Sequence, residues 1–144
     1  VLKDDENEVP IFLKEAFKKG NRVQDILTSN MRVGLTGNEI LKSALIQGRK
    51  EGLIPSIYTH PLGKYGHSAG TTIGMWDSQD GVPVNGAYPL HKNTAYAIEL
   101  NTTVAIKEWN KDIRIMLEEA GFFGDNTFEY VNERQTEIKP IHIK

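Results

Sequence analysis

The 144 residues are 39% hydrophobic and 25% charged, the balance of a single water-soluble globular domain. With a net charge of −2 and no run of Lys and Arg, nucleic acid is excluded as a partner; no apolar run nears the roughly 20 residues of a membrane span. The absence of cysteine excludes disulfides, thiolate metal sites and a cysteine nucleophile, but it does not decide the compartment. We expect a cytoplasmic location.

The first third of the chain is expected to be helical. Residues 1–8 are interpreted as the end of a strand entering an acidic turn, as in a chain cut from something longer. A helix is expected from residue 11, with Gly20 as its end, and a second helical face over 23–31. A capping box at 36–39 predicts one more helix, which Gly and Pro stop at 52–55. These helices are interpreted as scaffold.

The rest of the chain is expected to be mainly β. A strand is expected over 56–60. The glycine-rich stretch that follows (63–86) is expected to be a region where the backbone passes close to its neighbours. The alternative for this stretch is disorder, but it is too apolar for that. Side chains alternate between apolar and polar over 94–106 and 113–120, the pattern of half-buried strands.

Two further short strands are expected over 128–131 and 136–143. The sequence thus predicts an α+β fold, with N-terminal helices packed on a curved, mainly antiparallel sheet.

One histidine and two glutamates could bind a metal. His67 lies among small residues that would let its ring enter a cavity; the alternative is a hydrogen-bonded structural histidine. Glu99 lies mid-strand on the face opposite the apolar side chains, where a carboxylate needs a partner or solvent. The alternative to a ligand is a residue on a solvent-exposed strand face. Glu118 and Glu119 must point to opposite faces, and parity favours Glu118 unless a bulge intervenes. Such nitrogen and oxygen donors suit Zn²⁺, Mn²⁺ or Co²⁺.

Three segments in order resemble a known family. Residues 57–77, IYTHPLGKYGHSAGTTIGMWD, resemble the metal-histidine segment of the creatinase/aminopeptidase P group, the pita-bread metallopeptidases. Residues 97–101 (AIELN) are similar to its first glutamate strand, and 114–119 (RIMLEE) to its last, where the first glutamate of the pair is the ligand. The resemblance extends to 107–109 and 134–137 and covers nearly the whole chain.

The resemblance implies a hydrolase with two divalent metal ions, held by two aspartates, one histidine and two glutamates. By carry-over, His67 binds one metal, Glu99 is a ligand that also takes the water's proton, and Glu118 bridges both metals. His60 matches the substrate-side histidine, which donates a hydrogen bond near the oxyanion; the alternative is a strand-end histidine. The implied catalytic residues are His60 and Glu99, and the implied metal ligands are His67, Glu99 and Glu118.

Two departures limit what the resemblance implies. The family's aspartates would precede Val1, and neither Asp4 nor Asp5 can replace them. A further family histidine, shortly after the metal histidine, is also absent; Asp77 could substitute for it in part, but loop capping is the favoured role of Asp77. Residues 1–144 are therefore expected to be the C-terminal part of one catalytic domain. We predict that this chain binds at most one metal weakly and has no useful peptidase activity.

The favoured function is cleavage of peptides by an Xaa-Pro aminopeptidase-type enzyme in a longer parent protein. The alternatives are a non-catalytic module that binds peptides or proteins, and a creatinase-like hydrolase of a C–N bond. The loop over 77–90 is expected to line the pocket. A peptide is the expected substrate, and family analogy alone points to a homodimer.

Overall fold

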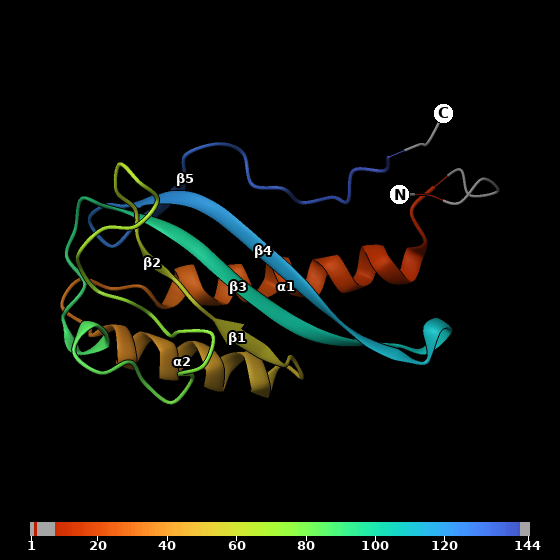
Figure 1. Cartoon of the computed structure of the whole chain (residues 1–144), viewed down its shortest axis with the longest axis horizontal. Coiled ribbons are helices and arrows are strands. Elements are labelled where there is room, and N and C mark those ends of the chain that lie inside the picture. The colour runs from red at the N-terminus through yellow and green to blue at the C-terminus, as the bar shows by residue number, and fades with distance from the viewer. Residues whose placement is uncertain (1, 3–7, 142–144) are drawn as a thin grey trace.

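The computed structural model describes residue 2 and residues 8–141, which form two helices packed on one face of a five-stranded sheet (Figure 1). The predicted α+β fold is confirmed. The elements are α1 (Ile11–Asn30), α2 (Gly37–Lys50), β1 (Pro55–Ile57), β2 (His60–Pro61), η1 (Asn85–Ala87), β3 (Thr94–Ile106), η2 (Lys107–Trp109), β4 (Lys111–Phe123) and β5 (Phe128–Tyr130). Residues 1–8, including Asp4 and Asp5, lie mostly outside the described part of the chain.

The sheet is built around one long hairpin. Strands β3 and β4 pair antiparallel over thirteen positions each, from Thr94 opposite Phe123 to Ile106 opposite Lys111. The order is β1-β3-β4-β5, with β2 also paired to β3, and each of these pairings is antiparallel. The predicted strand over 94–106 is confirmed, and the one over 113–120 is confirmed but longer.

The strand predicted over 136–143 is wrong for residues 136–141, while 142–143 lie outside the described residues. The chain leaves the sheet after β5, and 136–138 lie beside the first half of α1, where they line a groove with Ile11 and Phe17. Ile138 packs against the core from there. The apolar side chain of Ile138 is therefore partly buried without a strand. The pattern that predicted a strand over 136–143 reflects this packing instead.

Gly20 does not end the first helix, contrary to prediction; α1 runs through it as one element of 20 residues. A Cβ atom at this position would lie 2.7 Å from Cγ2 of Ile115 and 2.9 Å from Cδ1 of Leu117. The glycine therefore allows α1 to approach β4 closely. Helix α2 begins as predicted: the Glu39 backbone N–H donates to Thr36 Oγ1 at 3.2 Å, and the Thr36 N–H donates to Glu39 Oε2 at 2.8 Å.

The core lies between the helices and the sheet. The even-numbered side chains of β3 from Tyr96 to Ile106 are buried there, with Ile98 fully covered, so the predicted alternation is confirmed. The glycine-rich segment is packed onto the same body, since Ile73 is buried and Thr59 pairs with it. Gly74 has a φ of 72°, and a Cβ there would clash with the Ile57 carbonyl oxygen. The close backbone approach predicted for this segment is thus present.

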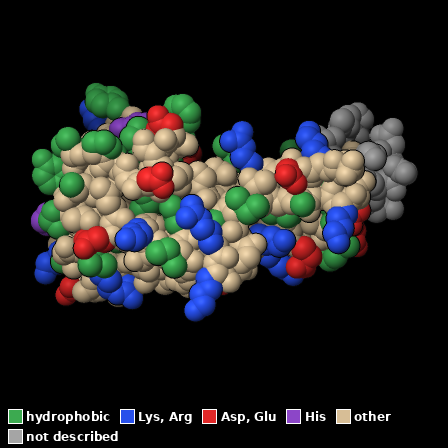
Figure 2. Space-filling view, turned by 90° about the horizontal axis from the view of Figure 1, so that it is seen from below, with side chains coloured by type: hydrophobic (Ala, Val, Ile, Leu, Met, Phe, Trp, Pro, Cys, Tyr) green, Lys and Arg blue, Asp and Glu red, His purple; other side chains and the backbone are tan. Residues whose placement is uncertain are grey.

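The surface mixes charges of both signs. Figure 2 shows Lys and Arg side chains interspersed with Asp and Glu over the face in view. Neither described helix has the length and apolar character that crossing a membrane requires.

Candidate functional site

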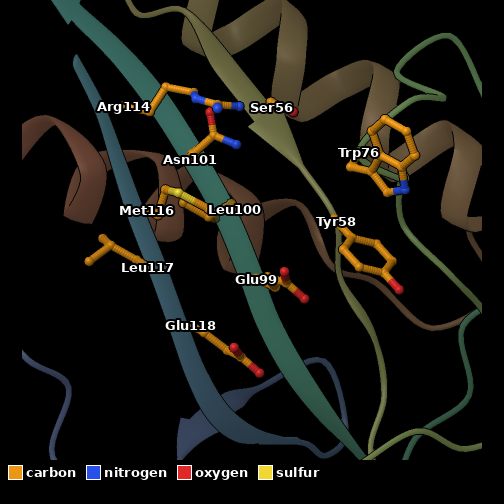
Figure 3. A pocket seen from close by; sticks show the side chains of 10 residues that line it. All are labelled: Ser56, Tyr58, Trp76, Glu99, Leu100, Asn101, Arg114, Met116, Leu117 and Glu118. Atoms are coloured by element: carbon orange, nitrogen blue, oxygen red, sulfur yellow. The ribbon is translucent and has the colours of Figure 1, made fainter.

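Glu99 of β3 and Glu118 of β4 are directly opposite each other in the hairpin. Both side chains lie on the sheet face away from α1, and Figure 3 shows them directed the same way. The strand faces predicted for the two residues are confirmed. Glu119 lies on the other parity, where its carboxylate accepts a hydrogen bond from the Gln135 backbone N–H at 3.0 Å. The alternation that separates Glu118 from Glu119 therefore holds without a bulge.

The environment of Glu99 disfavours its charged form relative to that of an ordinary glutamate. Partial burial raises the pKa of this carboxyl, and the like charge of Glu118 raises it further. His60 and His67 act in the opposite direction, but their effect is smaller and the pKa of Glu99 stays above its usual value. The side chain keeps 35% of its surface exposed, so it can exchange a proton with a ligand or with water. A carboxyl with a raised pKa accepts a proton more readily than an ordinary surface glutamate does.

His60 and His67 form a stacked pair beside the carboxylates. Their ring centroids are 4.2 Å apart and their planes differ by 16°. His60 is buried at β2, whereas His67 lies on an exposed loop. Both rings lie near enough to Glu99 to lower the pKa of its carboxyl, and Nε2 of His60 is 3.8 Å from Oε2 of Glu99.

The orientation of His60 follows from one backbone contact. Its Nδ1 lies 3.0 Å from the Pro61 carbonyl oxygen, which only accepts, so Nδ1 carries a proton. Its Nε2 then faces Glu99, at 3.8 Å from Oε2. That separation is too long for a hydrogen bond but allows an ion pair when the ring is protonated. His60 can donate from Nε2 only as an imidazolium.

The predicted metal ligands do not converge within the described chain. Among residue 2 and residues 8–141, no group of three or more His, Asp or Glu side chains is gathered closely enough to hold a metal ion. Glu99 and Glu118 offer opposed carboxylates whose repulsion a cation would relieve, which fits a divalent metal in chemistry. The assignment of His67, Glu99 and Glu118 as ligands stays a prediction. Asp77 accepts a hydrogen bond from Ser78 at 3.2 Å, as a loop residue would.

A cavity of about 300 Å³ extends along the sheet from the two glutamates. Its lining residues are Ser56, Tyr58, Trp76, Glu99, Leu100, Asn101, Arg114, Met116, Leu117 and Glu118 (Figure 3). None of these lining residues belongs to the loop over 77–90, which was expected to line the pocket; Trp76, just before it, does, whereas Asn85 and Tyr88 of the loop line a separate cavity. Sequence reasoning did not select Arg114 and Asn101 as site residues. Strand parity was the available signal, because it places them on the same face as Glu118 and Glu99.

Comparison with known proteins gives a fold but no family. No protein-family model and no curated protein matches the sequence. The structure is similar to an X-Pro aminopeptidase from Thermotoga maritima MSB8, with a TM-score of 0.65 and 18% identity over 91% of this chain and 33% of that one. It is also similar to a methionine aminopeptidase from Rickettsia prowazekii, with a TM-score of 0.59 and 15% identity over 85% of this chain and 53% of that one.

The chain thus spans about a third and about a half of the length of these two proteins. At such low identity the likeness establishes the fold alone. The chain has an α+β fold similar to that of the pita-bread aminopeptidases.

Proposed function

We propose that this chain forms part of the catalytic domain of a metal-dependent hydrolase that cleaves peptides in the manner of an Xaa-Pro aminopeptidase. The observation that carries the proposal is the opposed pair Glu99 and Glu118, with His60 and His67 beside it. The fold likeness to two aminopeptidases supports the same conclusion. The remaining ligands would come from a longer parent protein.

Each side chain has a role that its surroundings support. His67, Glu99 and Glu118 would be the ligands of Mn²⁺, Zn²⁺ or Co²⁺; a bound divalent ion lowers the pKa of its water and polarises a carbonyl. Glu99 would take a proton from water, as its raised pKa suits. His60, held by the Pro61 carbonyl, would act as a donor to the substrate from Nε2 in its protonated form.

Metal binding tests the proposal directly. The chain would be equilibrated with Mn²⁺, Zn²⁺ or Co²⁺, and bound metal counted by elemental analysis alongside calorimetric titration. We expect at most one weakly bound ion per chain, because three ligands with two negative charges cannot neutralise two divalent cations. Peptidase activity should be absent from this chain alone.

Two variants make the test specific. Glu118→Gln should weaken binding at least about tenfold, because a carboxylate ligand becomes a neutral amide. The matched control is Glu129→Gln, which removes an exposed charge on β5 and should leave binding unchanged. Equal loss of metal binding in both variants, or unchanged binding in Glu118→Gln, would contradict the ligand assignment. Two tightly held ions would contradict the view that this chain carries only part of the site.

A further inference from the structure

The cavity beside the glutamates is electrically asymmetric. Glu99 and Glu118 lie at one end, and Arg114 lies four residues before Glu118 on the same strand face. Four residues of an extended strand span about 13 Å. Figure 3 shows Arg114 next to Asn101 and close to Ser56, well separated from the two carboxylates. Among the ten described residues that line the cavity, Arg114 is the only basic one.

Arg114 is available for a ligand. It is exposed, and it takes part in none of the ion pairs formed by residue 2 and residues 8–141. Its neighbours in the cavity, Asn101 and Ser56, are neutral and offer further donors. A guanidinium with five N–H donors matches the geometry of a carboxylate better than that of any other peptide group.

We propose that this end of the cavity, at Arg114, binds a carboxylate carried by a short peptide, and so sets the substrate class of the site. The inference rests on the proposed function, which places the reacting carbonyl at Glu99 and Glu118. The peptide's N-terminal ammonium would lie at the acidic end and its carboxylate at the basic end, so charge complementarity fixes the direction of binding.

The dimensions fit a peptide of about three residues. An extended chain advances about 3.3–3.6 Å per residue, so a carboxylate two residues beyond the reacting carbonyl comes within reach of the long arginine side chain. The volume of about 300 Å³ is at the lower end of the range for small-ligand pockets. Tyr58, Trp76 and Met116 supply apolar surface for the residues between the two charged ends.

The test compares three peptides on the metal-free 144-residue chain by calorimetry. Ala-Pro-Ala carries a C-terminal carboxylate, Ala-Pro-Ala amide carries none, and Ala-Pro-Asp amide carries a side-chain carboxylate at the same residue. We expect at least one carboxylate peptide to bind about tenfold more tightly than Ala-Pro-Ala amide. Which of the two does so identifies the source of the carboxylate.

Variants tie the preference to the residue. Arg114→Gln should abolish the preference for a carboxylate, and Arg114→Lys should retain part of it as a point charge. Lys111→Gln, an exposed cation on the same strand but outside the cavity, is the matched control and should keep the full preference. Equal binding of all three peptides, no binding of any, or a preference that survives in Arg114→Gln would overturn the inference.

The two proposals fail in different ways. If Arg114→Gln removes the carboxylate preference while Glu118→Gln leaves metal binding unchanged, the carboxylate site stands and the hydrolase proposal falls. If metal binding depends on Glu118 but the preference for a carboxylate peptide is unchanged in Arg114→Gln, only the present inference falls.

Discussion

At the scale of single residues, the opposition of Glu99 and Glu118 is unfavourable for folding. Like charges directly across an antiparallel pair destabilise a sheet, and burial adds to the cost for Glu99. Such an arrangement is typical of a functional site, where a ligand later compensates the repulsion.

Neutralising one of the two should therefore stabilise the metal-free chain. We expect Glu118→Gln to raise the free energy of unfolding by about 0.5 kcal/mol, a value within the range for cross-strand pairs. Urea denaturation at neutral pH in the presence of a chelator measures this. Glu129→Gln, which lacks an opposed carboxylate, should change little. A loss of stability in Glu118→Gln would show that the two charges do not repel as the register implies.

Glu39 gives the opposite case, a carboxylate that its surroundings favour. Hydrogen bonds from the Thr36 backbone N–H and hydroxyl lower the pKa of Glu39 below its usual 4.5. A lowered pKa contributes stability that is complete above the usual value and is lost as pH falls through the lowered one. The melting temperature of Glu39→Gln should thus be lower than that of the wild-type chain at neutral pH, and the difference should shrink as the pH falls.

Thermal melting followed by circular dichroism over a series of pH values measures this change. The control is Glu129→Gln, whose difference from the wild-type chain should not follow the same pH course. A gap for Glu39→Gln that stays constant down to acid pH would contradict the role of the charge in the capping box.

At the scale of elements, the alternation of side chains predicted β3 and β4 well because each strand has one buried face. Helix α1 could not be delimited in the same way. A glycine ordinarily weakens a helix, and only the position of Ile115 and Leu117, far along the chain, explains why the helix continues through Gly20. A contact between residues so far apart in the chain cannot be predicted from the local sequence around Gly20.

Replacing Gly20 tests this packing. An added methyl group would be favourable for helix formation by about 1 kcal/mol, but it would press on the stiff, branched Ile115 side chain. Overpacking of this kind costs about 1–3 kcal/mol. We expect Gly20→Ala to lower the free energy of unfolding by about 1 kcal/mol, as measured by urea denaturation.

The matched control is Ser43→Ala on the exposed side of α2, where a smaller gain in helix propensity meets open surface. It should be neutral or slightly stabilising. Stabilisation of similar size in both variants would mean that α1 does not approach β4 as closely as Gly20 permits.

At the scale of the whole molecule, the sequence predicted which side chains share a face but not the shape of the site. Parity placed Glu99 and Glu118 correctly, because it depends on the strands alone. The boundary of the cavity depends on how the glycine-rich segment folds back, and that brought Trp76 to the wall instead of residues 77–90. The convergence of ligands on a metal depends on distances that no spacing in the sequence encodes.

The hairpin joins distant parts of the molecule. The turn at Lys107–Trp109 lies at the far tip of β3 and β4, where Trp109 packs edge-to-face on Phe12 of α1 at 5.4 Å. This turn sets the register of all thirteen pairs. Because side chains change face at every residue, one residue gained or lost there would turn Glu118 and Arg114 away together. In evolution, the turn can therefore vary in composition but not in length if the site is kept.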